Sequence, residues 1–284
     1  MPPKVIILAA GRGSRLKHYT ADRPKCLLPL GSKTLLQHQL AAFAAHGLDD
    51  IHVVRGYLSE KIDYPKITYH ENTDFRNNNI LNSLFCAEAA LEGPVIVSYA
   101  DILFEADVIG VLLKSEHDIA IVVDSDWRNY YAGRLDHPIT EAEAVIMDDG
   151  RRVVRVGKII TRNQQVDGEF IGMMKLSTRG ADLLKSHFQQ ARAAFWDKPF
   201  QRAAVFRNAY LTDLLQYMAD LGVAIHCVMI EGGWKEIDTV EDYEKAAAVG
   251  SLGHNGPTAV RALVTGNPTL SSARFHHGRN SGVE

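Results

Sequence analysis

Short, unbroken apolar runs alternate with amphipathic stretches along the first 124 residues. The run from Val5 to Ala10 is β-branched and ends at a glycine, which is typical of a strand buried on both faces. Residues 33–46 carry leucines and a phenylalanine at helical spacing, so this stretch is predicted to be a helix. Similar strands are expected at 50–57, 66–72, 94–101 and 118–124, and helices at about 79–91 and 106–116. Strands that alternate with helices in this way predict parallel βαβ units.

The pattern changes after residue 124. Two β-like runs flank Asp149-Gly150, the usual signal of a hairpin turn. Further strands are expected at 168–177, 224–231 and 234–238, and helices at about 179–195 and 208–221. Thr239 followed by acidic residues has the pattern of a capped helix start. We therefore expect an α/β fold, a Rossmann-like three-layer α/β/α sandwich with a mostly parallel central sheet and a small β-hairpin or lid insertion.

The expected domain covers residues 1–249, with an acceptor-binding part at about 124–178. Residues 250–284 are rich in Gly, Pro, Ser, His and Asn, and are predicted to form a flexible C-terminal tail. A linker or an arm that contacts a second subunit of a homodimer is the alternative function for this tail.

Composition excludes several classes of function. The formal net charge is −3, so no general basic field favours nucleic acid or a membrane surface. Three widely spaced cysteines predict neither a zinc site nor a disulfide framework, which indicates a reducing, cytoplasmic location. No stretch is long and apolar enough for a signal peptide or a membrane span.

The loop behind the first strand, Gly11 to Arg15, combines glycines with cations. Gly11 and Gly13 lack a Cβ, so backbone N–H groups can approach phosphate oxygens closely. Arg12 and Arg15 add forked donors that suit phosphate, and Lys25 follows in the segment Arg-Pro-Lys-Cys-Leu-Leu-Pro. The spacing is not that of a Walker A loop, and the third glycine of the dinucleotide fingerprint is missing.

The combined pattern L-A-A-G-R-G-S-R-L and R-P-K-C-L-L-P resembles the sugar-1-phosphate nucleotidylyltransferase type of nucleotidyltransferases. Ser14 stands where sugar-specific members more often carry Thr. The resemblance implies that a phosphorylated acceptor attacks the α-phosphate of a nucleoside triphosphate and expels pyrophosphate. It also implies that Arg15 and Lys25 are catalytic and that the triphosphate loop consists of Leu8, Ala9, Ala10, Gly11, Arg12, Gly13 and Ser14.

Two aspartates end predicted strands, and Asp101 does so at the ligand-facing edge of the sheet. Asp101 ends V-I-V-S-Y-A-D, and Asp238 ends W-K-E-I-D just before the capped helix. Two polyanions need a neutralising cation, and Mg²⁺ is usually held by one or two carboxylates and phosphate oxygens. The resemblance implies the same pair, so Mg²⁺ is the expected cofactor. A strand-end cap or turn is the alternative for an isolated aspartate.

The segment N-N-N-I-L-N-S-L, residues 77–84, resembles the cytidylyltransferase branch, which includes phosphocholine and 2-aminoethylphosphonate cytidylyltransferases. The resemblance covers roughly residues 4–249 and implies a base site beside Asn78, Asn79, Ser83 and Tyr99. An asparagine-rich loop with a helix cap is the alternative.

The acceptor is expected in the middle of the chain, where aromatic and charged residues cluster. Rings and carboxylates suit an ammonium head, and an arginine suits an acidic phosphate or phosphonate end. The candidates for acceptor binding are Asp126, Trp127, Tyr131, Arg134, Glu143 and Glu169. A solvated lid with packing aromatics is the alternative, and His137 is expected to be a loop residue.

These features predict a Mg²⁺-dependent cytidylyltransferase. Its partners would be CTP and a small phosphonate or phosphate such as 2-aminoethylphosphonate or phosphocholine. The alternatives are a hexose-1-phosphate nucleotidyltransferase that uses UTP, dTTP or GTP, and a catalytically silent regulatory homologue.

Overall fold

The first strand, β1 (Lys4–Ala9), lies inside a nine-stranded sheet in the computed structural model, which describes residues 2–158 and 165–249. Parallel neighbours flank β1 on both sides, β4 (Ile51–Arg55) and β6 (Val95–Tyr99), and β5 (Ile67–Glu71) continues the sheet beyond β4. The expected tail after residue 250 lies outside the described residues.

An antiparallel strand joins the two halves of the sheet. This strand, β11 (Gly168–Leu176), pairs with β6 and with β8 (Ile119–Asp124), and β12 (His226–Ile230) runs parallel to β8. The predicted hairpin forms from β9 (Ala144–Met147) and β10 (Val153–Gly157), and β9 pairs with the start of β11. The expected fold class is confirmed: the sheet is mostly parallel, and β11 with its hairpin is the antiparallel part.

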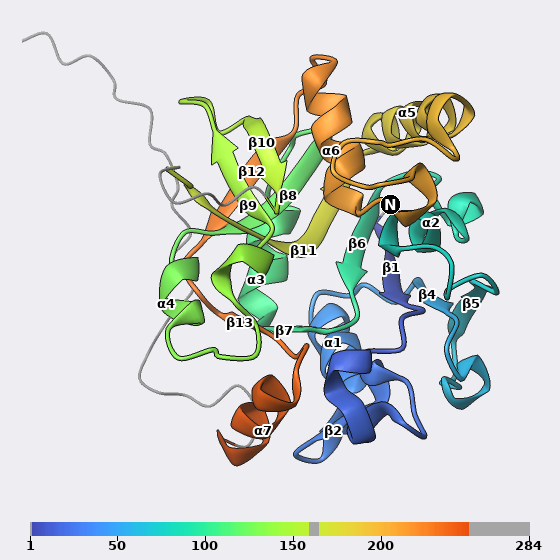
Figure 1. Ribbon diagram of the computed structural model, residues 1–284, viewed down its shortest axis with the longest axis vertical. Coiled ribbons are helices and arrows are strands. Elements are labelled where there is room, and N and C mark those ends of the chain that lie inside the picture. Colours follow the sequence, from blue (N-terminus) through green and yellow to red (C-terminus); the bar gives the residue numbers. More distant parts are fainter. Residues whose placement is uncertain (1, 159–164, 250–284) are drawn as a thin grey trace, which may run out of the picture.

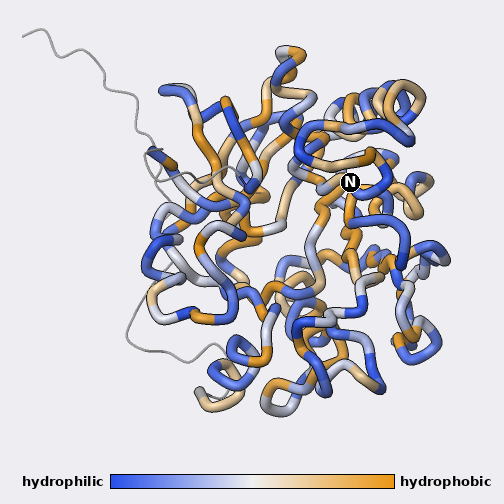
Figure 2. Tube along the Cα trace, in the orientation of Figure 1, coloured by the Kyte–Doolittle hydropathy of each residue, from blue (hydrophilic) through white to orange (hydrophobic). Residues whose placement is uncertain are grey.

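Helices cover both faces of the sheet, as Figure 1 shows. Along β1, Ile6 and Leu8 belong to one apolar core, whereas Val5 and Ile7 belong to the other. The first core is covered by α2 (Ile80–Phe85), α5 (Thr178–Phe195) and α6 (Leu211–Asp220), and the second by α1 (Leu35–Ala44) and α3 (Ala106–Leu113). Figure 2 shows apolar residues along the central strands and more hydrophilic residues in the outer loops.

Short elements surround the edge where the parallel strands end. The ribbon of β7 (Ile102–Phe104) and β13 (Trp234–Glu236) leads into α7 (Val240–Val249), and β2 (Pro29–Leu30) pairs with β3 (Lys33–Thr34). A separate apolar cluster packs these pieces together; it contains Leu16, Leu28, Leu103, Ile237 and Tyr243. The first and last segments of the domain therefore share one small core.

Two local features differ from the sequence prediction. The helix expected at about 79–91 ends at Phe85 and is followed by a separate 3₁₀ turn, Glu88–Ala90. A helix that the pattern did not predict, α4 (Trp127–Tyr131), buries its aromatic residues in a small apolar cluster beside β9. Within the described ranges, no helix is long and apolar enough to cross a membrane.

Candidate active site

The loop after β1 turns at Gly13, whose φ of 66° lies in the left-handed region. A Cβ at Gly13 would lie 3.0 Å from both Cβ and Cδ of Lys25, so a side chain there would collide with the lysine. The carbonyl of Gly13 accepts hydrogen bonds from the hydroxyl of Thr20 and the backbone N–H of Leu16, at 3.0 Å each. Glycine is therefore needed for the turn itself and for the close packing of Lys25.

Lys25 lies at the floor of the site between the two predicted carboxylates. Its Nζ donates to Oδ2 of Asp101 at 2.9 Å and to Oδ1 of Asp238 at 2.8 Å, and its side chain is 10% exposed. Burial alone would lower the pKa of Lys25, but the charges of Asp101, Asp238 and Glu236 outweigh burial and raise it. The lysine is therefore a fixed cation at neutral pH.

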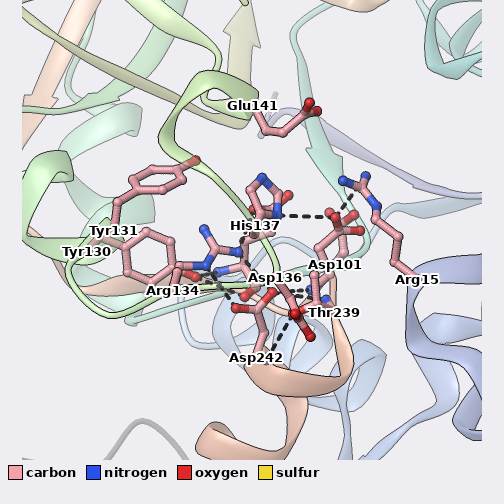
Figure 3. A network of polar contacts seen from close by, with 12 residues as sticks. Arg15, Asp101, Tyr130, Tyr131, Arg134, Asp136, His137, Glu141, Thr239 and Asp242 are labelled. Carbon is pink, nitrogen blue, oxygen red and sulfur yellow. Dashed lines mark hydrogen bonds and ion pairs between the residues drawn. The ribbon is translucent and has the colours of Figure 1, made fainter.

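Asp238 contacts basic side chains from several directions. Its Oδ2 lies 2.8 Å from Nη2 of Arg15 and 3.3 Å from Nδ1 of His137. Burial alone would raise the pKa of Asp238, but Lys25, His137 and Arg15 outweigh it and hold this pKa well below its usual range. In Figure 3, Arg15 and His137 approach the carboxylate group beside Asp101 from opposite sides. The Arg15 side chain is about half exposed (51%), so it can reorient toward a ligand.

These side chains border a cavity of about 310 Å³ at the carboxyl ends of β1 and β6. This place matches the rule that ligands of open α/β sheets bind beyond the carboxyl ends of the strands. The structure brings most of the candidate nucleotide and catalytic residues to its wall: Leu8, Ala9, Ala10, Gly11, Gly13, Ser14, Arg15, Lys25, Asn78, Asn79, Ser83, Asp101 and Asp238.

The asparagine segment, residues 77–84, forms hydrogen bonds within the protein and also lines the cavity. Asn72, buried under the loop, donates to Oδ1 of Asn78 at 2.8 Å and to the Ser83 hydroxyl at 2.9 Å. Asn79 caps α2 by accepting from the N–H of Ile80. Asn78 and Asn79 therefore take part in the structure of the loop and also line the cavity.

Two candidate nucleotide residues lie elsewhere. The Arg12 guanidinium lies over the ring of Tyr57, 5.5 Å from its centre, and Arg12 is not among the residues that line the cavity. Tyr99 borders a second, smaller cavity, and its hydroxyl donates to Glu143 at 3.2 Å. A Cβ at Gly172 would come within 2.5 Å of the Tyr99 ring, so this glycine makes room for the ring at the bulge of β11.

The second cavity, of about 40 Å³, contains three of the acceptor candidates, Tyr131, Glu143 and Glu169. Burial raises the pKa of Glu143 to about 7, although hydrogen bonds from Thr212 and Tyr99 oppose that rise. Burial also raises the pKa of Glu169 well above its usual value. Oε1 of Glu169 accepts from the Tyr131 hydroxyl at 2.7 Å, whereas Oε2 is buried and accepts no hydrogen bond from any described residue.

Three other acceptor candidates lie outside this cavity. Trp127 is 1% exposed and packs in the apolar cluster with Tyr131, while the exposed Asp126 accepts from Asn129 at the start of α4. Arg134 is buried, forms two hydrogen bonds with Asp242 at 2.8 and 2.9 Å, and contacts Glu236 at 3.2 Å. The structure therefore gives Trp127 a packing environment and Arg134 a network of carboxylate partners.

Sequence reasoning missed Glu236 and His137 as neighbours of the site. Glu236 is the last residue of the short strand β13 and precedes Asp238 by two residues, and this spacing was the signal that could have found it. Burial raises the pKa of Glu236, and the nearby charges of Asp238 and Asp101 raise it further. His137 lies in a long loop, and no local sequence pattern identifies it as a site residue.

Comparisons with known proteins identify the family of this chain. The sequence profile described as the MobA-like NTP transferase domain matches residues 5–229. A CTP:phosphoglutamine cytidylyltransferase from Campylobacter jejuni is 29% identical over 251 residues, which cover 84% of this chain and 97% of that protein. A 2-aminoethylphosphonate cytidylyltransferase from Lancefieldella rimae is 30% identical over 158 residues, 54% of this chain and 60% of that protein.

Among solved structures, a CTP:phosphocholine cytidylyltransferase from Streptococcus pneumoniae superposes with a TM-score of 0.66 at 22% identity. The match covers 88% of this chain and 99% of that chain. At this identity the likeness concerns the fold.

Proposed function

Because this chain belongs to the MobA-like NTP transferase domain family and is a nucleotidyltransferase, we propose that it transfers CMP from CTP to a small phosphate or phosphonate acceptor. The observation that carries the proposal is Lys25, fixed between Asp101 and Asp238 on the floor of a cavity walled by the glycine loop. The choice of CTP is supported by the two cytidylyltransferases reported above.

In the proposed reaction, an anionic oxygen of the acceptor attacks the α-phosphorus of CTP. A new P–O bond forms while the bond to the bridging oxygen of the β-phosphate breaks, and pyrophosphate leaves with that electron pair. The attacking oxygen already carries negative charge, so the protein needs no general base. Catalysis then consists of alignment and charge neutralisation.

Lys25 and Arg15 would serve different parts of this alignment and charge neutralisation. Lys25 is buried and rigidly held, so it is suited to stabilise charge that develops at the α-phosphate. Arg15 is exposed enough to leave Asp238 and pair with the triphosphate in a forked geometry. Gly11 borders the cavity, and a Cβ there would meet no protein atom within 4 Å, which leaves space for phosphate oxygens.

The carboxylates fit a magnesium ion. Oδ1 of Asp101 is buried and accepts no hydrogen bond from the part of the chain that the structure describes. Such an oxygen, together with Asp238, is the oxygen-donor set that Mg²⁺ prefers. We propose that Asp101 and Asp238 hold Mg²⁺, which when bound neutralises phosphate charge.

The smaller cavity supports an acceptor with an N–H group at the end remote from its phosphorus. Its volume of about 40 Å³ suits one small polar group. Its carboxylates, Glu143 and Glu169, have raised pKa values because they are buried. A cation bound in this cavity would stabilise the charged form of both groups. A primary ammonium can donate to the buried Oε2 of Glu169, which a quaternary ammonium cannot do.

The test is pyrophosphate release with Mg²⁺ across four nucleoside triphosphates and four acceptors: phosphoglutamine, 2-aminoethylphosphonate, phosphocholine and glucose-1-phosphate. We expect release with CTP and an amine-bearing acceptor. Release only with UTP or dTTP and the sugar phosphate would overturn the proposal in favour of a hexose-1-phosphate enzyme. Silence with every pair would overturn it in favour of an inactive homologue.

A matched pair of lysine variants tests whether pyrophosphate release depends on the proposed site. Lys25→Met should abolish release, whereas Lys61→Met should leave it unchanged, because Lys61 contacts the carbonyl of Asp22 and is not among the residues that line the cavity. Equal activity of the two variants would remove Lys25 from the proposed chemistry.

A further inference from the structure

His137 lies in the loop between α4 and β9, and it faces two carboxylates that come from the β13 segment. Its Nδ1 is 3.3 Å from Oδ2 of Asp238 and 3.7 Å from Oε2 of Glu236. The imidazole is 3% exposed, so solvent does not separate it from these oxygens. One nitrogen and two carboxylate oxygens thus converge in a buried space.

The spacing of these atoms approaches that of ligands to a common ion. Donor atoms that each bind an ion at about 2.1 Å lie at most about 4.2 Å apart. The two distances from His137 satisfy that limit, and one ligand atom from each of the three residues lies within 4.8 Å of the others. Small adjustments of the side chains would therefore complete a coordination sphere.

The Nδ1 atom of His137 lacks a conventional partner. It is buried, and its contacts with the two carboxylates do not have hydrogen-bond geometry with any group in the described ranges. A buried imidazole nitrogen without a hydrogen bond is costly unless another group binds it. A metal ion is such a group.

We propose that His137, Glu236 and Asp238 form a second divalent-cation site that selects a transition-metal ion such as Mn²⁺ over Mg²⁺. This site is distinct from the oxygen-only pair Asp101 and Asp238, with which it shares Asp238. Imidazole suits transition-metal ions such as Fe²⁺, Ni²⁺ and Zn²⁺, and Mn²⁺ accepts it beside carboxylates, whereas Mg²⁺ prefers oxygen donors and retains water. The His137 imidazole is therefore the ligand that confers selectivity for a transition-metal ion.

The fold holds these ligands in place before any ion arrives. Arg134 joins the loop to α7 through Asp242, and it also contacts Glu236. Glu241 accepts hydrogen bonds from the backbone N–H groups of Leu135 and Asp136 at 2.8 Å each. Figure 3 shows the part of this network formed by Arg134 and Asp242 beside His137. The loop that carries His137 is thereby fixed to the segment that carries the two carboxylates.

Arg15 competes for one of the ligand atoms. Its Nη2 lies 2.8 Å from the same Oδ2 of Asp238 that faces His137. An ion at this position and the Arg15 contact are therefore in competition. Removing the guanidinium, as in Arg15→Gln, should tighten binding of the ion.

The site can be tested without nucleotide or acceptor, so the result is independent of the proposed transfer reaction. Mn²⁺ is titrated into the full chain in buffer with a large excess of Mg²⁺, and free Mn²⁺ is followed by electron paramagnetic resonance. The wild type should bind one equivalent of Mn²⁺ despite the Mg²⁺. His137→Gln should weaken this binding at least tenfold, and Arg15→Gln should strengthen it.

A matched histidine variant and a spectroscopic readout complete the test. His52→Gln should bind Mn²⁺ as the wild type does, because His52 contacts His70 and Asp50 on β4 and β5. Electron spin-echo spectroscopy of Mn²⁺ on the wild type should show ¹⁴N coupling from an imidazole, a result that needs no variant to fold. Absence of that coupling, or equal Mn²⁺ affinity of the wild type and His137→Gln, would overturn the proposal.

Discussion

Replacing Glu143 with glutamine removes the charge of an enclosed carboxyl group while keeping its volume. The hydroxyl of Thr212 donates to one oxygen at 2.7 Å, and that of Tyr99 donates to the other at 3.2 Å. Burial is the largest influence on the pKa of Glu143, while Lys158 lowers this pKa and Asp213 raises it. Glu143→Gln therefore tests how much the ionisation of Glu143 lowers the free energy of unfolding.

The sign follows from the direction of the shift. The folded protein holds the Glu143 proton up to a pKa of about 7, whereas the unfolded chain releases it near the ordinary 4.5. The contribution of this group to stability is thus fully present below pH 4.5 and is lost as pH rises through about 7. The difference between the two values, at about 1.4 kcal/mol per pH unit, amounts to about 3 kcal/mol above pH 7.

The measurement is urea unfolding of the wild type and Glu143→Gln between pH 4.5 and 8, followed by tryptophan fluorescence. The free energy of unfolding of the variant should rise relative to the wild type by up to about 3 kcal/mol over that range. Glu141→Gln is the control that should show little pH dependence over this range, because a 2.6 Å contact with Lys158 lowers the pKa of Glu141, so its contribution to stability is lost only as pH falls below 4.5. If the difference in free energy of unfolding between Glu143→Gln and the wild type does not vary with pH, the reasoning is refuted.

Three further substitutions test the site and its surroundings. Asp101→Asn should reduce Mg²⁺-supported turnover at least hundredfold with an unchanged circular dichroism spectrum, and normal turnover would contradict its proposed metal role. Gly13→Ala should destabilise the fold by about 1–2 kcal/mol in thermal or urea unfolding, because its φ is positive and the new Cβ meets Lys25; an unchanged midpoint would argue against the described turn. Trp127→Ala should lower the free energy of unfolding by about 3–5 kcal/mol, since the ring is fully buried. If unfolding is unchanged and only the acceptor KM rises, the ring binds acceptor as the sequence suggested.

The residues that could be predicted from the sequence follow strand ends. Gly13 and Asp101 follow the apolar parallel strands β1 and β6, and the carboxyl ends of parallel strands meet at one edge, so their proximity follows from the strand pattern. Asp238 follows β13, which pairs antiparallel with β7 outside the main sheet, so its place beside them does not follow from that rule. The place of His137 and the ion pairs of Arg134 could not be found this way, because the loop that carries both residues is positioned by contacts with α7, more than 100 residues later in the chain. The antiparallel direction of β11 escaped prediction for the same reason: it is set by pairing with β6 and β8 and not by local spacing.

The contact between Lys25 and Asp238, which joins residues 213 positions apart, has a consequence for synthesis of the protein. A nascent chain that has emerged from the ribosome only as far as β12 already contains every strand of the main sheet. It still lacks Glu236, Asp238 and α7, so Lys25 has only Asp101 as a partner and the opening loop has only part of its small core. If the proposed roles of Lys25 and Asp238 hold, catalytic competence begins only after the segment beyond β12 has been translated. A chain released early would contain every strand of the main sheet but would lack part of the candidate site.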